Sequence, residues 1–326
     1  MTPSIRSRVI ASATAFVLGF GVANYGILRV PGRDRWLWFA VAIVLMITSV
    51  IGVLIADSRR RVSMWAVLGF EVLIVFTLLP LLWTFTLATS AEAVTTQSLL
   101  PSDVRWSVFG DVLASDSIRQ AAMTSVLVSA IATAVSMLLA VPAAYALVRR
   151  QVRGRRLVYF FVLAVLLAPL VALAGPFGDQ LRAFGVFGSR FVLAAPTLMI
   201  TLPLATWLCV TLMRDLPWSL RDSVRADGAT RGQTFRAFAL PMVVPGLLAV
   251  TLITFIVACN DAVIGATLTA GDESRTLPAT LLLAAEQLEQ PSAAVAATGL
   301  LWLVPAVLVL LAVPRRTIRL LGRTYS

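Results

Sequence analysis

The chain has 326 residues, of which 59% are hydrophobic and only 13% are charged. Soluble domains carry about twice that share of charged residues, so the composition predicts a membrane protein. All 27 basic residues are arginine, and a chain without lysine cannot form a phosphate-binding loop of the G-x-x-x-x-G-K-[ST] type. The chain also lacks histidine, which excludes histidine proton relays and the commonest metal ligand.

The net charge of +11 is interpreted as a topology signal beside membrane spans and not as a nucleic-acid footprint. Cys209 and Cys259 both fall within apolar runs, where cysteine behaves as a small buried hydrophobe. They therefore imply no disulfide framework, and the sequence predicts no metal site.

Apolar runs in the chain are long enough to cross a hydrocarbon core of about 30 Å at about 1.5 Å per residue. We expect a hairpin of two spans within residues 1–60, and we prefer it to a cleaved signal peptide because the second span follows at once. Six further spans form a core over residues 61–326, at about 64–88, 118–148, 157–175, 191–213, 242–268 and 293–313. The prediction is an all-α polytopic membrane protein with about eight transmembrane helices.

Arginine placement gives this topology its direction. With the N-terminus in the cytoplasm, most arginines lie on the cytoplasmic side, including the clusters within 59–61, 149–156 and 214–236. Arg29, Arg33 and Arg35 would be external, so the first hairpin fits the rule least well.

A charged stretch, residues 215–241, separates two of the apolar spans and reads as helix, turn, helix. Pro217 suits the first turn of a helix, and Gly228 ends that helix because glycine reaches left-handed conformations cheaply. Thr230 and Gln233 have capping-box spacing and begin the second helix.

We expect Leu240 and Pro241 to close this second helix, and Phe235 and Phe238 to share one face that is available to a partner or to the membrane surface. The pattern by itself is more typical of an ordinary basic loop at the membrane interface.

Aligned on Asp227-Gly228-Ala229, the stretch resembles the cytoplasmic coupling loop of ATP-binding-cassette (ABC) importer permeases. That loop carries a Glu-Ala-Ala triplet, a glycine four residues later and then Leu-Pro. Here Asp222-Ser223-Val224 stands at the triplet, and Leu240-Pro241 stands at the end. Asp-Gly-Ala is similar to the carbohydrate-type branch of the family.

The resemblance covers about residues 61–314 and implies a type I importer permease core of six helices. It implies a multi-pass protein of the bacterial inner membrane that works with a second permease subunit, two cytoplasmic ATP-binding subunits and an extracytoplasmic solute-binding protein, surrounded by lipid. The chain would bind no cofactor and would not be an enzyme, because ATP and Mg are used by the partner ATPase. The residues that it assigns to ATPase coupling are Asp222, Arg225, Asp227, Gly228, Ala229, Phe235, Leu240 and Pro241.

Polar residues within the spans are candidates for a translocation path. A carboxylate at the bilayer centre costs about 2.5–3.5 kcal/mol on insertion scales, so Asp261 needs compensation. Thr254, Ala258, Asp261 and Gly265 share one face if the span is a continuous helix. In the span at 118–148 a similar stripe is formed by Ser125, Ser129, Thr133, Ser136 and Ala140. The predicted path residues are Asp261, Asn260 and Thr254 with Ser129 and Thr133; close helix packing through small residues is the alternative.

Other functions stay open at this level. The importer could carry a polyamine, an oxyanion or a metal, and a secondary transporter working alone would also place charges within spans. A membrane-embedded enzyme or an assembly scaffold has little support, because the spans contain no carboxylate pair at metal-ligand spacing.

Overall fold

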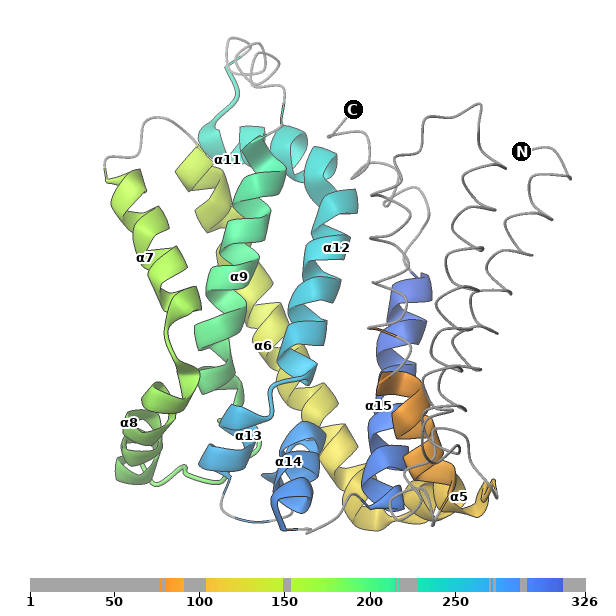
Figure 1. Ribbon diagram of the computed structural model, residues 1–326. Coiled ribbons are helices and arrows are strands. Elements are labelled where there is room, and N and C mark those ends of the chain that lie inside the picture. The colour runs from red at the N-terminus through yellow and green to blue at the C-terminus, as the bar shows by residue number, and fades with distance from the viewer. Residues whose placement is uncertain are drawn as a thin grey trace, which may run out of the picture. The chain divides into compact units, whose positions relative to one another are not determined.

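The computed structural model describes residues 77, 80–90, 104–148, 154–214, 216, 228–269, 271, 274–287 and 292–312. Within these ranges every regular element is a helix (Figure 1). The apolar sequence explains this, because a backbone in hydrocarbon must satisfy its own N–H and C=O groups. The all-α prediction is confirmed for this part of the chain, whereas the hairpin predicted within residues 1–60 lies outside it.

The described residues belong to two compact units, one within Met1–Gly110 and Leu288–Leu300 and the other within Asp111–Gln287 and Leu301–Ser326. In the first unit residues 80–89 are helical, and the Arg105 N–H donates to the Thr89 carbonyl at 2.8 Å. The Trp106 ring meets the Phe85 ring edge-on, with centroids 6.0 Å apart. Helices α5 (Ser107–Ala114) and α15 (Ala293–Ala312) have residues in both units.

The second unit is a helix bundle. Helix α6 (Asp116–Val148) packs against α9 (Ala194–Arg214) and α12 (Leu240–Cys259), and α7 (Arg155–Leu167) packs against α9. The inward face of α6 is built from small side chains that allow close approach; Ala132, Ala140 and Ala144 are completely buried.

Three shorter helices gather at one end of this bundle (Figure 1). Helix α13 (Val263–Leu268) contacts both α8 (Leu170–Ala183) and α14 (Leu277–Gln287), and α14 also contacts α6. Helix α11 (Arg231–Thr234) lies at the opposite end, where α7 begins and α9 ends (Figure 1).

In the described part of the chain, three helices are long and apolar enough to cross a membrane: Asp116–Val148, Ala194–Arg214 and Gly232–Cys259. The bent pair formed by α7 and α8 makes a fourth if it counts as one span. The spans predicted at 118–148, 191–213 and 293–313 correspond to α6, α9 and α15. The total of eight stays a prediction.

The span predicted at 157–175 is wrong as a single helix. Helix α7 ends at Leu167, and its axis makes an angle of 94° with that of Ala172–Ala183. Pro169 causes the break, because it has no N–H to continue the helix and it forces the preceding residue into extended conformation. Ala168 is extended, with φ −66° and ψ 136°.

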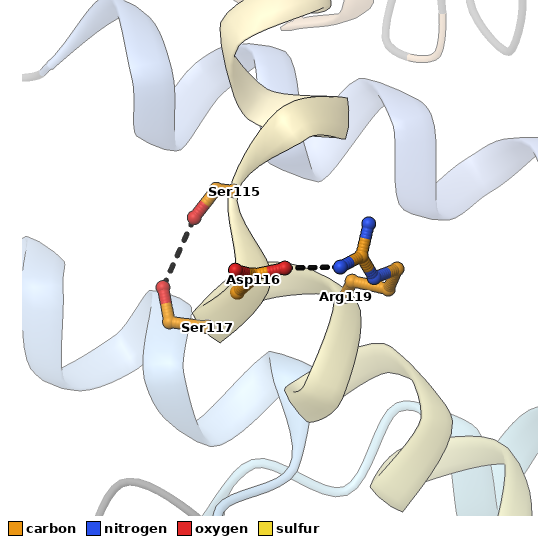
Figure 2. Close-up of polar contacts among 4 residues, drawn as sticks. All are labelled: Ser115, Asp116, Ser117 and Arg119. Atoms are coloured by element: carbon orange, nitrogen blue, oxygen red, sulfur yellow. Dashed lines mark hydrogen bonds and ion pairs between the residues drawn. The ribbon is translucent and has the colours of Figure 1, made fainter.

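The first turn of α6 is polar and exposed. Asp116 forms an ion pair with Arg119 one turn later, and the hydroxyls of Ser115 and Ser117 are 3.0 Å apart (Figure 2). A carboxylate at a helix N-terminus is favourable for the helix dipole, although an exposed pair contributes little stability. This turn marks an end of the bundle that faces water.

Candidate functional site

The second half of the charged stretch begins with a left-handed turn. Gly228 has φ +86°, a conformation that L-residues with a Cβ adopt only at a cost. A Cβ at this position would meet no atom within 4 Å, so backbone conformation, and not packing, requires the glycine. The turn predicted at Gly228 is confirmed. Of the predicted coupling residues nearby, Ala229 follows directly, whereas Asp222, Arg225 and Asp227 lie outside the described residues.

The capping box predicted after this turn is present. The Thr230 N–H donates to Gln233 Oε1 at 2.8 Å, and the Gln233 N–H donates to Thr230 Oγ1 at 3.3 Å. The hydroxyl of the buried Thr234 donates to the Thr230 carbonyl at 2.9 Å. Since the box satisfies N–H groups that a helix N-terminus leaves free, the helix has a fixed starting point at Thr230.

We expect Thr230→Ala to loosen this helix start by about 1 kcal/mol, because the cap acceptor is lost. Hydrogen–deuterium exchange of the backbone amides around Gln233 should then accelerate about fivefold. Thr211→Ala is a matched control, since the exposed Thr211 hydroxyl bonds only the Trp207 carbonyl within α9. Unchanged exchange in Thr230→Ala would show that the cap does not hold the helix.

The prediction that Leu240 and Pro241 close the second helix is wrong. Helix α11 continues through one π-helical turn, η1 (Phe235–Ala239), into α12, and Gly232–Cys259 is a single helix. The Leu240 N–H donates to the Phe235 carbonyl, five residues back. A proline in a regular α-helix clashes with the carbonyl four residues back, and the wider π turn lets the chain pass Pro241 without ending the helix.

The aromatic side chains of this segment pack partly against the chain's own core, and their availability to a partner or to the membrane surface stays a prediction. Phe235 lies 4.9 Å from Tyr145 of α6, measured between ring centroids, with the rings inclined at 51°. Phe235 and Phe238 are half-buried against a cluster that includes Ala239 and Val243. The exposed side of the segment consists of Gly232, Gln233, Arg236 and Ala237.

The end of the bundle that carries this segment is basic. Arg155 and Arg156 begin α7, and Arg214, the last residue of α9, lies over the Tyr159 ring at 5.2 Å. Arg236 is exposed in η1. The positive-inside rule assigns such an end to the cytoplasm.

The polar stripe predicted on α6 faces the bundle interior. Ser125, Ser129, Thr133 and Ser136 are all at most 4% exposed. The Ser136 hydroxyl donates to Thr201 Oγ1 of α9 at 2.8 Å, and Ser129 contacts the Cys259 thiol of α12. Thr133 Oγ1 has no hydrogen-bond partner among the described residues. These hydroxyls join α6 to its neighbours, and Thr133 keeps an unused donor and acceptor.

The predicted span 242–268 is broken where its most polar residues lie. Helix α12 ends at Cys259 and α13 begins at Val263, so the single face expected to unite Thr254 with Asp261 does not exist. Asn260 Nδ2 donates to the Ile256 carbonyl at 2.8 Å, while Asp261 Oδ1 accepts the Ile264 N–H at 3.2 Å. Asn and Asp often end and start helices in this way, because their side chains compete for backbone groups.

The five predicted path residues are thus not equivalent. Thr254 is fully buried and its hydroxyl donates to the Val250 carbonyl at 2.8 Å, while Asp261 Oδ2 is buried without a hydrogen-bond partner in the described residues. A cavity beside Cys259 and Asn260 has a volume of only about 50 Å³ and mostly apolar walls. Small-molecule pockets are usually several hundred Å³, so this arrangement of helices holds no sugar-sized site there.

Sequence reasoning missed helix α14 and its close contact with α6 and α13. The Leu277 N–H donates to the buried Ser125 Oγ at 2.7 Å. A Cβ on Gly265 of α13 would lie 2.9 Å from the Ala279 Cβ and nearer still to the Thr276 hydroxyl. Pro278, near the start of an apolar run, was the available signal, because proline favours the first turn of a helix.

Comparisons with known proteins agree on one family. Residues 136–319 match the family described as "Binding-protein-dependent transport system inner membrane component". The trehalose transport system permease protein SugB of Mycobacterium tuberculosis is 32% identical over 264 residues, which cover 80% of this chain and 96% of that protein.

More distant relatives include the trehalose/maltose transport system permease protein MalG of Thermococcus litoralis, 29% identical over 49% of this chain and 57% of its own length. Among solved structures, a bacterial ABC transporter involved in the import of the acidic polysaccharide alginate contains a chain with the same fold. It has a TM-score of 0.58 at 22% identity and covers 74% of this chain and 91% of its own.

Proposed function

Because the chain belongs to the family of binding-protein-dependent transport system inner membrane components and is a permease subunit of a carbohydrate-type ABC importer, we propose that its loop at 215–241 couples ATP hydrolysis by a partner subunit to movement of its membrane helices. One observation carries the proposal. The helix that begins at the Thr230 cap runs without a break into a membrane-length helix, so a force on the loop acts directly on the bundle.

In this mechanism two cytoplasmic ATPase subunits close on ATP and Mg, and the loops of two permease subunits move with them. The bundle then opens to the outside, where a solute-binding protein delivers its cargo. The permease itself binds no nucleotide. Within the loop, Gly228 provides the turn and Thr230 the fixed helix start, while Asp222, Arg225 and Asp227 contact the ATPase.

We assign residues 61–326 to the permease core and 1–60 to a membrane extension, in a multi-pass protein of the bacterial inner membrane. The solute is a neutral oligosaccharide of about two sugar units. This rests on the names of the relatives, which transport trehalose, maltose or diacetylchitobiose. Sugar hydroxyls both donate and accept hydrogen bonds, as do the side chains of Ser129 and Thr133.

The path through the bundle is proposed to involve Ser129, Thr133, Thr254, Asn260 and Asp261. Thr133 Oγ1 and Asp261 Oδ2 support this, because both atoms are buried without a hydrogen-bond partner among the described residues, whereas buried polar groups are ordinarily paired. A solute or water that enters when the helices move apart would satisfy them.

The test begins with purification of the tagged full-length chain in mild detergent and mass spectrometry of the proteins that accompany it. An ATP-binding subunit with vanadate-sensitive hydrolysis should co-purify. The complex, placed in vesicles with its solute-binding protein, should accumulate trehalose or maltose only when ATP is supplied. Spermidine and phosphate serve as control solutes of other chemical classes.

Two results would contradict the proposal. A preparation without any ATPase that still moves solute along an ion gradient would identify a secondary transporter. ATP-driven uptake of spermidine or phosphate, with no uptake of either disaccharide, would retain the importer and overturn the carbohydrate assignment.

A further inference from the structure

The π turn η1, which belongs to the proposed coupling loop at 215–241, contacts a second membrane helix, α6, through a pair of aromatic rings. Phe235 is the first residue of η1, and its ring centroid is 4.9 Å from that of Tyr145 on α6. Tyr145 is only 7% exposed although it lies within one turn of the end of α6. The two rings therefore meet inside the protein, on the side of α11 and η1 opposite to their exposed residues.

The surroundings of this contact are closely packed. Ala144 and Ala239 are completely buried, and the cluster around the ring pair continues through Val243 of α12 into Val210 and Met213 of α9. In a densely packed interior a displacement is transmitted and not absorbed. A tilt of the loop helix must therefore either carry the end of α6 with it or separate the two rings.

The π turn makes the contact specific. Helix α11 and the five residues of η1 separate the cap at Thr230 from Leu240, and the wide turn accommodates Pro241 while the helix continues. Along the helix itself, movement of the loop can pass only to α12. The Tyr145–Phe235 pair is a separate lateral connection from the loop to α6, the helix that packs on both α9 and α12.

We propose that Tyr145 is a positioning residue for transport: its ring, packed on Phe235, makes α6 move together with α12 when the ATPase displaces the loop. The proposal rests on the coupling function proposed above. Without the ring, the loop would lose its direct contact with the end of α6, so that α6 would follow the loop less closely, and hydrolysis would continue with a less productive opening of the bundle.

The experiment uses the complete transporter in vesicles and measures solute uptake and ATP hydrolysis on the same preparation. Only variants that co-purify with the ATPase subunit at the parent's ratio are compared. If the proposed coupling function is wrong, the parent protein itself will not co-purify with an ATPase, and this result is known before any variant is compared. Tyr145→Ala should lower the solute transported per ATP at least tenfold, with hydrolysis within about twofold of the parent. Tyr145→Phe keeps the ring and should retain most of the parent ratio.

Tyr145→Leu fills most of the space without an aromatic ring, and it replaces the alanine variant if that variant does not assemble. It should also lower the amount of solute transported per ATP. Phe161→Ala is the matched control, because Phe161 of α7 is 68% exposed and its loss removes a ring from the surface of the bundle. A role in folding alone would reduce uptake and hydrolysis in parallel. That parallel loss, or an unchanged ratio in both Tyr145→Leu and Tyr145→Ala, would overturn the proposal.

Discussion

Gly228→Pro is expected to abolish ATP-driven uptake while the protein still inserts into the membrane and folds. Proline fixes φ near −65°, whereas this position has φ +86°. The turn must therefore change its direction, and under the coupling mechanism proposed above the loop would no longer present its contact surface to the ATPase. The bundle is spared, because among the described residues a Cβ on Gly228 would meet no atom within 4 Å. Uptake into vesicles and the amount of co-purified ATPase measure the effect.

Two variants separate conformation from other effects. Gly228→Ala should be intermediate, because a left-handed alanine costs about 1–2 kcal/mol. Gly232→Ala lies in the same loop, has no positive φ and likewise meets no atom within 4 Å, so it should transport normally. If Gly228→Pro retained parent uptake, the turn would have no part in coupling; if it failed to insert, Gly228 would be a folding residue instead.

Gly265→Val is expected to displace α14 and to destabilise the end of the bundle away from the loop. Even a Cβ at this position would approach the Ala279 Cβ to 2.9 Å, which real Cβ contacts essentially never show. Since Ala279 is completely buried and belongs to α14, relief requires movement of the helix. Overpacking of this kind costs about 1–3 kcal/mol, and the bond from the Leu277 N–H to Ser125 would lengthen or break.

Thermal unfolding in detergent should show a lower Tm, by several degrees, and amides of 277–287 should exchange faster with deuterium. Gly271→Val is the matched control, since a Cβ on Gly271 meets nothing within 4 Å. Combining Gly265→Ala with Ala279→Gly should recover part of the stability lost in Gly265→Ala. Equal Tm values for Gly265→Val and Gly271→Val would refute the close packing of α13 on α14.

Local signals in the sequence predicted local structure well. The spacing of Thr230 and Gln233 predicted a capping box that the structure contains, and Gly228 was correctly placed in a left-handed turn. The serine and threonine stripe on α6 was correctly placed on one face, which is buried. Each of these features depends on residues within a few turns of one helix, so spacing is enough to find them.

The failures concern how helices continue or stop. Pro241 was expected to end a helix and Pro169 to be passed without a break, but the structure does the opposite at both positions. Proline imposes the same local requirement in each case. At Pro241 packing of Phe235 and Ala239 in the core stabilises a π turn, so the helix continues. At Pro169 the described side chains of α7 include no buried residue that would hold α7 and α8 in line.

The sequence by itself determined the class of protein and its family, because composition, the length of apolar runs and the loop motif are properties of the linear amino-acid sequence. It also determined the turn at Gly228 and the cap at Thr230. Only the tertiary structure decided that Phe235 faces Tyr145, that Asp261 lies in the break before a separate helix, α13, and that Ser125 accepts a hydrogen bond from the start of α14. The contacts of Phe235 with Tyr145 and of Leu277 with Ser125 join residues of different helices. They depend on packing complementarity between helices, which residue spacing along one helix does not reveal.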